Sequence, residues 1–443
     1  MRVAIVGAGK LGFYLAECLV AEEHDVVVIE KNEERREIVA EKLDVLTLPG
    51  NGAGPRVLMN PDVRSADLMV AVTDSDEVNM IVCMAAKQFG IPQTVARIRN
   101  LEYIDRQMEG EFHRALGIDL IISPEYATAV EISRVLMIPG ALEVGEFAGG
   151  KVRLQEMRIR SKSPLTDTPL HSLVLPPHIL VAGIFRAGEM IIPHGDDVLL
   201  PHDHAFFIGA PEALAQLETG GKDARAARNV LIVGAGRIGF HLALMLEERG
   251  LYVKVMDKQI ERCRALSQEL KRGRVLCGDG TDLEFLQEEG VSEADTVVSV
   301  TEDDKLNLLV ALLAKEYGGK KTIARVSRTE YMPLMEKLGV DIVVSPRLIT
   351  AGVILSQARR GHFLSVSLVE GARAQAMEVL VSPETTITGK KLKDAKLPKN
   401  CLVGAVVHEG DAFVPNGDTV LNMGDQAIIF ALPDTIGAVE KIF

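Results

Sequence analysis

A glycine-rich turn followed at a fixed distance by an acidic residue occurs twice in this chain of 443 residues. One copy runs Gly7-Ala8-Gly9-Lys10-Leu11-Gly12 and reaches Glu30, and the other runs Gly234-Ala235-Gly236-Arg237-Ile238-Gly239 and reaches Asp257. In both copies the acid lies 18 residues after the third glycine, and an apolar stretch precedes the turn and the acid. This spacing is typical of a βαβ unit that binds a dinucleotide. The sequence therefore predicts two such units.

The chemistry of the motif defines the expected ligand. The glycines let the backbone approach a pyrophosphate, and the N-terminus of the following helix offers N–H groups to the anion. Glu30 and Asp257 can accept hydrogen bonds from both ribose hydroxyls, and because a carboxylate repels a 2′-phosphate we expect NAD(H) rather than NADP. Lys31 and Lys258, next to the acids, weaken this preference. The alternative is a pair of Rossmann folds whose turns have lost their ligand.

The duplication continues beyond the glycine turns, in segments that follow further predicted strands. Parallel strands end at one rim of the sheet, where open α/β sheets bind ligands. We therefore add to the two nucleotide sites the matched residues Asn51 and Asp279, Thr73 and Thr301, Asp74 and Glu302, and Arg97 and Arg325, together with Thr281. For the two arginines the alternative is a surface ion pair, and for the two threonines a helix cap.

One pair of matched segments differs in chemistry. Asn51 and Ala53 stand in the first copy where the second copy has Asp279 and Thr281. A carboxylate and a hydroxyl near the expected adenine edge are thus replaced by an amide and a methyl group. We expect the two sites to differ in affinity or in preferred nucleotide.

A smaller module follows each nucleotide-binding unit, since residues 188–199 match residues 410–421. Short apolar strands that alternate with helices predict an α/β fold with two Rossmann-like, doubly wound parallel sheets. We expect these at residues 1–140 and 229–362, each followed by a small α+β module at 141–218 and 363–443, with a linker at 219–228. Ser123-Pro124 and Ser345-Pro346 are typical helix starts.

Composition excludes several classes of protein. With 49 basic and 62 acidic residues, the net charge of −13 argues against nucleic acid as a partner. The five scattered cysteines suit a reduced, cytosolic chain, and no apolar run is long enough for a membrane span. Any membrane role must therefore involve a partner. His194, His202 and His204 lie among aspartates, but the second copy lacks them, so we interpret this segment as a solvated turn and predict no metal site.

Catalytic chemistry is missing from the predicted sites. A dehydrogenase needs an acid–base residue delivered to the nicotinamide by a substrate domain, and neither small module supplies one. Two nucleotide sites without such a group favour a sensor whose ligand changes its conformation. An NAD-dependent oxidoreductase is the alternative from another class.

These residues and the order of the modules resemble the TrkA family, the regulatory subunits of bacterial Trk-type potassium uptake. The resemblance covers the whole chain and makes the large and small modules similar to RCK-N and RCK-C domains (regulators of potassium conductance). It implies a non-enzymatic gating subunit that binds NAD(H), with ATP or ADP as alternative ligands. It also implies a homo-oligomeric ring, typically tetrameric, at the cytoplasmic face of the membrane beneath a TrkH- or TrkG-like channel subunit, in which the helices that begin at Ser123 and Ser345 cross over to neighbours. A regulator of another cation transporter is the remaining alternative.

Overall fold

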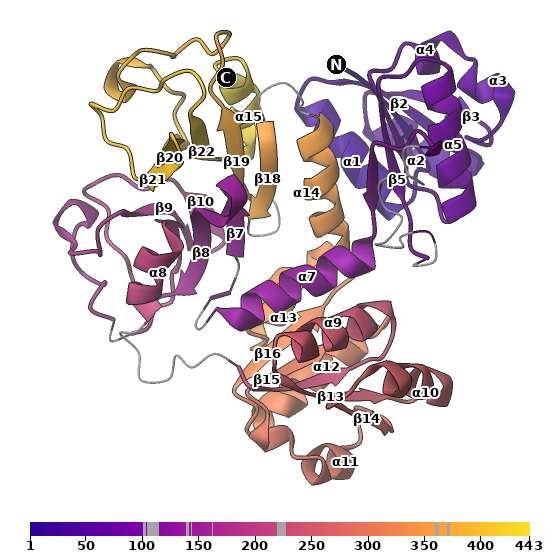
Figure 1. Ribbon diagram of the computed structural model, residues 1–443, viewed down its shortest axis with the longest axis vertical. Coiled ribbons are helices and arrows are strands. Elements are labelled where there is room, and N and C mark those ends of the chain that lie inside the picture. The colour runs from indigo at the N-terminus through magenta and orange to yellow at the C-terminus, as the bar shows by residue number, and fades with distance from the viewer. Residues whose placement is uncertain are drawn as a thin grey trace. The chain divides into compact units, whose positions relative to one another are not determined.

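The computed structural model describes residues 1–100, 103, 115–138, 141–142, 144–161, 163–218, 227–358, 363–369 and 373–443 (Figure 1). The chain divides into two compact units, each made of two segments. The first contains Met1–Ala127 and Arg347–Gly361, and the second contains Thr128–Pro346 and His362–Phe443. Most of the predicted linker lies outside the described residues.

The first unit is built on six parallel strands in the order β3-β2-β1-β4-β5-β6. They are β1 (Arg2–Val6), β2 (Asp25–Glu30), β3 (Leu46–Pro49), β4 (Leu68–Ala71), β5 (Gln93–Arg97) and β6 (Leu120–Ile122). The chain moves outward from β1 to β3 and then returns to β4 on the other side of β1. This reversal confirms the predicted doubly wound sheet, and it creates the crevice at which such sheets bind ligands.

Helices cover this sheet, and each buries at least one apolar side chain. They are α1 (Lys10–Ala21), α2 (Glu33–Lys42), α3 (Pro55–Leu58), α4 (Pro61–Arg64) and α5 (Asp76–Gln88). On α1 the buried side chains Leu11, Leu15 and Leu19 recur every four residues, as a helix face requires.

The second unit contains a parallel sheet of the same design, with strand order β14-β13-β12-β15-β16-β17. Its strands are β12 (Asn229–Val233), β13 (Tyr252–Asp257), β14 (Arg274–Cys277), β15 (Thr296–Ser299), β16 (Lys321–Arg325) and β17 (Ile342–Val344). Its helices are α9 (Arg237–Glu248), α10 (Ile260–Glu269), α11 (Leu283–Glu288), α12 (Asp304–Glu316) and α13 (Met332–Lys337). The duplication seen in the sequence is thus a duplication of folds.

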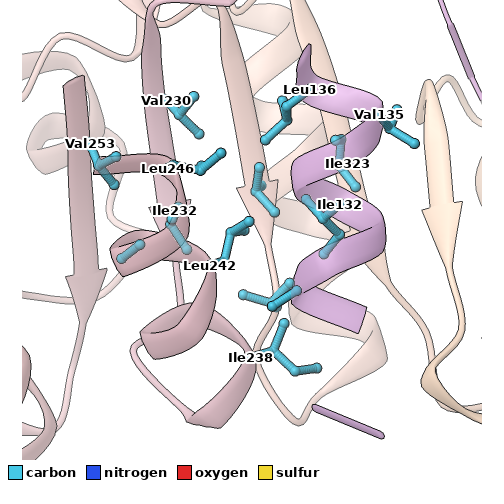
Figure 2. Packing of buried hydrophobic residues seen from close by; sticks show 14 of the residues in the cluster. Ile132, Val135, Leu136, Val230, Ile232, Ile238, Leu242, Leu246, Val253 and Ile323 are labelled. Carbon is cyan, nitrogen blue, oxygen red and sulfur yellow. The ribbon is translucent and has the colours of Figure 1, made fainter. Parts of the chain in front are cut away.

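The last helices of the two sheets are exchanged within the chain. From Thr128 onward, α7 (Pro124–Met137) belongs to the second unit, although it follows the first sheet. There Ile132 and Leu136 share one core with Leu242 of α9 and Ile323 of β16 (Figure 2). The resemblance implied that this helix crosses over to a neighbour. In this chain α7 packs on the parallel sheet of the second copy.

The reciprocal helix is α14 (Pro346–Ala358), which follows the second sheet but belongs to the first unit from Arg347 onward. Its Ile354 and Leu355 are fully buried, and the Arg347 guanidinium lies 5.5 Å from the centre of the Tyr14 ring on α1.

The two helix starts differ in their capping. The Tyr126 N–H donates to the Ser123 hydroxyl at 3.4 Å, which confirms the first predicted cap. The second helix also begins where predicted, at Pro346, but the predicted cap is wrong, since the buried Ser345 hydroxyl has no hydrogen-bond partner among the described residues.

Two small antiparallel sheets complete the second unit and share a core. One has the order β10-β9-β11-β8-β7, and the other β18-β19-β22-β20-β21. Phe206 of the first sheet packs on Phe430 of the second, with ring centres 5.9 Å apart. The first sheet consists of β7 (Val144–Phe147), β8 (Val152–Arg158), β9 (Ile179–Arg186), β10 (Glu189–Ile191) and β11 (His204–Gly209), followed by α8 (Pro211–Glu218). The second consists of β18 (Phe363–Val369), β19 (Ala374–Leu380), β20 (Cys401–His408), β21 (Asp411–Phe413) and β22 (Gln426–Ala431), followed by α15 (Ile436–Glu440).

A partly buried lysine joins the second parallel sheet to the segment that leads into β7. The Lys321 ammonium of β16 donates to the Ala141 carbonyl at 2.7 Å. Burial lowers the pKa of Lys321 from 10.5 to about 8, although the carboxylates of Asp341 and Glu156 act in the opposite direction. No helix in the described part of the chain is long and apolar enough to cross a bilayer.

This lysine predicts a rise in stability at alkaline pH. Below about pH 8 Lys321 is charged in both the folded and the unfolded chain, so the cost of burying the charge is fully present. Between about pH 8 and 10.5 only the unfolded chain keeps the proton, so stability rises with pH by at most roughly 3 kcal/mol. Urea unfolding across this range should show the free energy of unfolding of the wild type rising relative to that of Lys321→Met. A constant difference between the two proteins would contradict the assignment.

Candidate nucleotide-binding sites

The first glycine of each turn has a backbone that other residues rarely adopt. Gly7 has φ +103° and Gly234 has φ +111°, because the chain turns sharply from strand into helix. The third glycine is required by close packing: a Cβ on Gly12 would lie 1.9 Å from the Gly7 carbonyl oxygen, and on Gly239 it would lie 1.8 Å from that of Gly234. Each turn therefore requires glycine at its first and third positions.

The middle glycine of each turn faces open space. A Cβ on Gly9 would meet nothing within 4 Å, and on Gly236 it would meet only the Arg262 guanidinium at 3.8 Å. Gly9 and Gly236 are also the N-cap residues of α1 and α9, and neither helix has a side-chain cap. The backbone N–H groups of the first helical turn are thus available to an anion.

The acid at the end of the second strand is buried against its own turn. Glu30 accepts hydrogen bonds from the Ala8 N–H at 2.7 Å and the Asn32 N–H at 2.8 Å. Asp257 repeats the arrangement, accepting from Ala235 at 2.7 Å and Gln259 at 2.8 Å. Each carboxylate oxygen accepts one of these bonds and keeps a second lone pair for a ribose hydroxyl.

The loop after the third strand lies beside the turn in both copies. A Cβ on Gly52 would lie 2.0 Å from a methyl group of Val6, the residue before Gly7, and Gly280 has the same relation to Val233 at 2.4 Å. Asn51 and Asp279 therefore lie in loops that pack beside the turn, and their contact with a ligand stays a prediction.

The two loops share a shape but not a charge. The Ala53 N–H donates to the Asn51 side-chain oxygen at 3.1 Å, and in the second copy the N–H and hydroxyl of Thr281 donate to Asp279 at 2.9 and 2.8 Å. The bonds from Thr281, and then the charge of Lys258, lower the pKa of Asp279. The second site thus contains a carboxylate that the first site lacks.

An asparagine organises the loop after the fourth strand. Asn79 accepts from the Thr73 hydroxyl at 2.7 Å and its N–H at 2.9 Å, and donates to the Arg97 carbonyl at 2.7 Å. Asn307 makes the same contacts with Thr301 and Arg325. The predicted site residues did not include these asparagines, although both lie six residues after the matched threonine, and this identical spacing was the signal.

The threonines themselves do not cap helices. Ser75 caps α5 and Asp303 caps α12, so the alternative of a helix cap is wrong for Thr73 and Thr301. Thr73 lies against the glycine turn, since a Cβ on Gly7 would be 3.2 Å from its backbone. Their contact with a ligand stays a prediction.

The matched arginines are largely buried and have different partners. Arg97, whose side chain is 14% exposed, pairs with Asp74 at 3.2 Å. Arg325 donates instead to the Thr301 carbonyl at 2.5 Å, while Glu302, the counterpart of Asp74, is exposed. The Nε atoms of both arginines are buried without a hydrogen-bond partner among the described residues. The arginines are therefore neither in a simple surface ion pair nor fully hydrogen-bonded.

The remaining predicted residues lie around the same rim or away from it. Lys10 and Arg237 begin α1 and α9, and the exposed Lys31 and Lys258 follow the buried acids. In the small module, His204 contacts Glu156 at 2.6 Å, whereas the Asp203 carboxylate binds Arg186. Within the described residues these histidines do not gather with carboxylates into a cluster suited to a metal ion.

The different surroundings of the third and middle glycines predict that one substitution affects stability and the other affects nucleotide binding. Gly12→Ala should destabilise the first unit, because its Cβ would overlap the Gly7 carbonyl. Gly9→Ala should melt like the wild type but weaken nucleotide binding about ten-fold or more, because its methyl group would fill the space in front of the turn. Thermal melting and calorimetric titration with NAD check both; unchanged affinity in Gly9→Ala would contradict the placement of the pyrophosphate.

Comparison with known proteins agrees with this architecture. The TrkA-N domain family matches residues 3–124 and 230–346, and the TrkA-C domain family matches residues 154–219 and 376–443. A Trk system potassium uptake protein TrkA homolog of Archaeoglobus fulgidus is 39% identical over 443 residues, covering 100% of both chains. The TrkA of Azorhizobium caulinodans is 35% identical over 452 residues, covering 100% of this chain and 98% of that one.

Solved structures share the fold at low sequence identity. The GsuK channel bound to NAD has a TM-score of 0.63 at 18% identity, covering 100% of this chain and 78% of that one. The crystal structure of the GsuK RCK domain has a TM-score of 0.63 at 19% identity, covering 100% of this chain and 94% of that one. With both domain families matched in each half and relatives aligned over the full length, this chain belongs to the TrkA family.

Proposed function

We propose that this protein is the nucleotide-sensing regulatory subunit of a Trk-type potassium uptake system. The observation that supports this most is the duplicated turn, in which Gly9 and Gly236 leave open space beside a buried carboxylate. NAD(H) is the expected ligand, because its pyrophosphate suits the helix N-terminus and its ribose suits the acid. ATP and ADP offer the same phosphate and ribose chemistry and are alternative ligands.

A regulatory role fits the chemistry better than catalysis. Each parallel sheet is followed by a small antiparallel sheet rather than by a domain that delivers an acid–base residue to a nicotinamide. The names of the relatives refer to potassium uptake, and none of those cited describes an oxidoreductase. Turnover of NAD(H), followed by absorbance at 340 nm, would instead support the dehydrogenase alternative.

The exchanged helix offers a route from the ligand to the rest of the second unit. Helix α9 begins at the glycine turn, and its Ile238 and Leu242 share a core with Ile132 of α7 (Figure 2). A nucleotide that shifts the turn would move α9 and therefore its packing on α7. Ligands that favour different positions of these helices would bias the conformation of the subunit.

The partner in this proposal is an integral-membrane potassium channel subunit of the TrkH or TrkG type, which the protein would bind at the cytoplasmic face of the membrane. Assembly into a homo-oligomeric ring, typically a tetramer, is part of the same proposal. Ile81 on α5 and Leu309 on α12 occupy matched positions and are 49% and 46% exposed. Apolar side chains repeated on the outer helices suit contacts between copies.

We further propose that the two nucleotide sites are unequal. Asp279 and Thr281 give the second site a carboxylate and a hydroxyl where the first site has Asn51 and Ala53. A second carboxylate can accept another hydrogen bond from ligand donors, and it repels a phosphate-rich ligand such as ATP more strongly than an amide does.

An exchange of these side chains tests the inequality. Asp279→Asn with Thr281→Ala should make the second site resemble the first, and Asn51→Asp with Ala53→Thr should do the reverse. We expect the ratio of NADH to ATP affinity at each changed site to move about five-fold or more toward that of the other copy. Calorimetry is performed with the other site disabled by Glu30→Gln or Asp257→Asn, and unchanged ratios would refute the proposal.

The sensing role is tested by potassium flux. Liposomes that contain the cognate channel subunit should show flux that changes with NAD(H) or with ATP and ADP when the protein is present. The variant Asp257→Asn should lose the part of the response due to the second site, because an amide cannot accept from both Ala235 and Gln259 and from the ribose. Glu261→Gln, an exposed change on α10, is the matched control. Flux that is the same with and without the protein under every nucleotide would defeat the proposal.

A further inference from the structure

Two cysteines lie beside the acid of the second nucleotide site. Cys263 is on the first turns of α10, and its thiol donates to the Asp257 carbonyl at 3.2 Å and to the Leu276 carbonyl at 3.6 Å. Cys277 ends β14 and pairs directly with Asp257 in the parallel register. The Cys263 sulfur thus lies against the carbonyl of the residue before Cys277, and the nearby Cys277 thiol contributes to its raised pKa. The two cysteines therefore form a thiol pair beside Asp257, the predicted ribose acceptor.

The pair differs in exposure and in reactivity. Cys277 is exposed, whereas Cys263 is buried. Burial, and then the neighbouring Cys277, raises the pKa of the Cys263 thiol to about 11, so this thiol stays protonated near neutral pH. A peroxide in solvent thus meets the Cys277 sulfur first.

The thiol pair belongs to the second copy only. The matched positions in the first copy are Arg36, at the offset of 227 residues that also relates Glu30 to Asp257, and Pro49, at an offset of 228. The common fold of the two copies does not require these cysteines, since the first sheet forms the same order of strands without them.

The helix that holds Cys263 is also less firmly fixed than its counterpart. Asn32 caps α2 by accepting from the Arg35 N–H, but Gln259 makes no side-chain cap on α10. A cap of this kind contributes about 1 kcal/mol. The first turn of α10 can therefore shift at lower cost than that of α2.

Movement of this turn would reach the ligand. Arg262, the neighbour of Cys263, has its guanidinium 3.7 Å from the Asp257 carboxylate and 3.8 Å from the position of a Cβ on Gly236. Cys277 directly precedes the Gly278-Asp279 loop. A covalent bond between the two sulfurs would join α10 to this loop on the ribose side of the site.

We propose that Cys263 and Cys277 are a site of reversible oxidation, whose disulfide lowers the affinity of the second site for NAD and related nucleotides. The effect on affinity rests on the proposed function of that site, whereas the formation of the disulfide does not. The first site has no such pair and keeps its affinity. The protein would thus combine the oxidation state of its surroundings with nucleotide supply in one of its two sites.

The reaction needs a peroxide as oxidant. The Cys277 sulfur attacks one peroxide oxygen and the O–O bond breaks, giving a sulfenic acid and one water. The Cys263 sulfur then attacks the Cys277 sulfur, and its proton leaves with the displaced hydroxide as a second water. Two thiols lose two electrons and two protons, and hydrogen peroxide becomes two waters. A dithiol reductant reverses the change by thiol–disulfide exchange.

The first test maps the bond in the full-length protein. After treatment with hydrogen peroxide and alkylation of remaining thiols, peptide mass spectrometry without reduction should find Cys263 linked to Cys277. Cys277→Ser and Cys263→Ser should each abolish the linked peptide, and Cys401→Ser, a change in the second antiparallel sheet, should retain it. Saturating NAD should slow the loss of the Cys277 thiol. Absence of the linked peptide in the wild type would overturn the proposal.

The second test measures binding. Calorimetry with NAD on a Glu30→Gln background, which leaves the second site, should show affinity lowered about ten-fold or more by peroxide and restored by dithiothreitol. The Cys277→Ser variant should bind NAD equally before and after peroxide. Equal affinity in the oxidised and reduced wild type would overturn the regulatory claim. If the reduced protein bound no nucleotide, the proposed function of the site would fail while the mapped disulfide still stood.

Discussion

The hydrogen bond from the glycine turn to the acid of the second strand is the contact on which each nucleotide site depends. In both copies the backbone N–H after the first glycine donates to that carboxylate at 2.7 Å. The bond fixes the turn against β2 or β13 and buries a charge that only satisfied hydrogen bonds make tolerable. With the turn held, the first helix starts at a defined point, and the loops after the third and fourth strands can pack against it.

Much of this arrangement could be predicted from the sequence because it is local. The spacing from Gly12 to Glu30 is set by one helix and one strand, so it determines where the acid lies relative to the turn. The doubly wound parallel sheet followed from the same motif and the buried apolar strands. The loop of Asn51 also lay where the repeat placed it, since it follows β3 directly.

What could not be predicted depends on contacts between distant segments. The apolar faces of α7 and α14 would suit either parallel sheet, because the two sheets are copies, and periodicity alone cannot say which one a helix covers. Asn79 was missed because its role appears only when β4, α5 and β5 converge on it. Cys263 lies on α10 and Cys277 at the end of β14, so the two come close only after α10 packs on β14.

The exchange of α7 and α14 has a consequence for the ancestry of the chain. Each unit contains the last helix of the other copy, so a progenitor with one copy would have had this exchanged packing only as a pair of molecules. Fusion of two such genes would have changed connectivity without changing packing. It would also have ended the requirement that both halves of the pair be identical. Asn51 opposite Asp279, and Arg36 opposite Cys263, are differences that a symmetric dimer of one gene product could not have held.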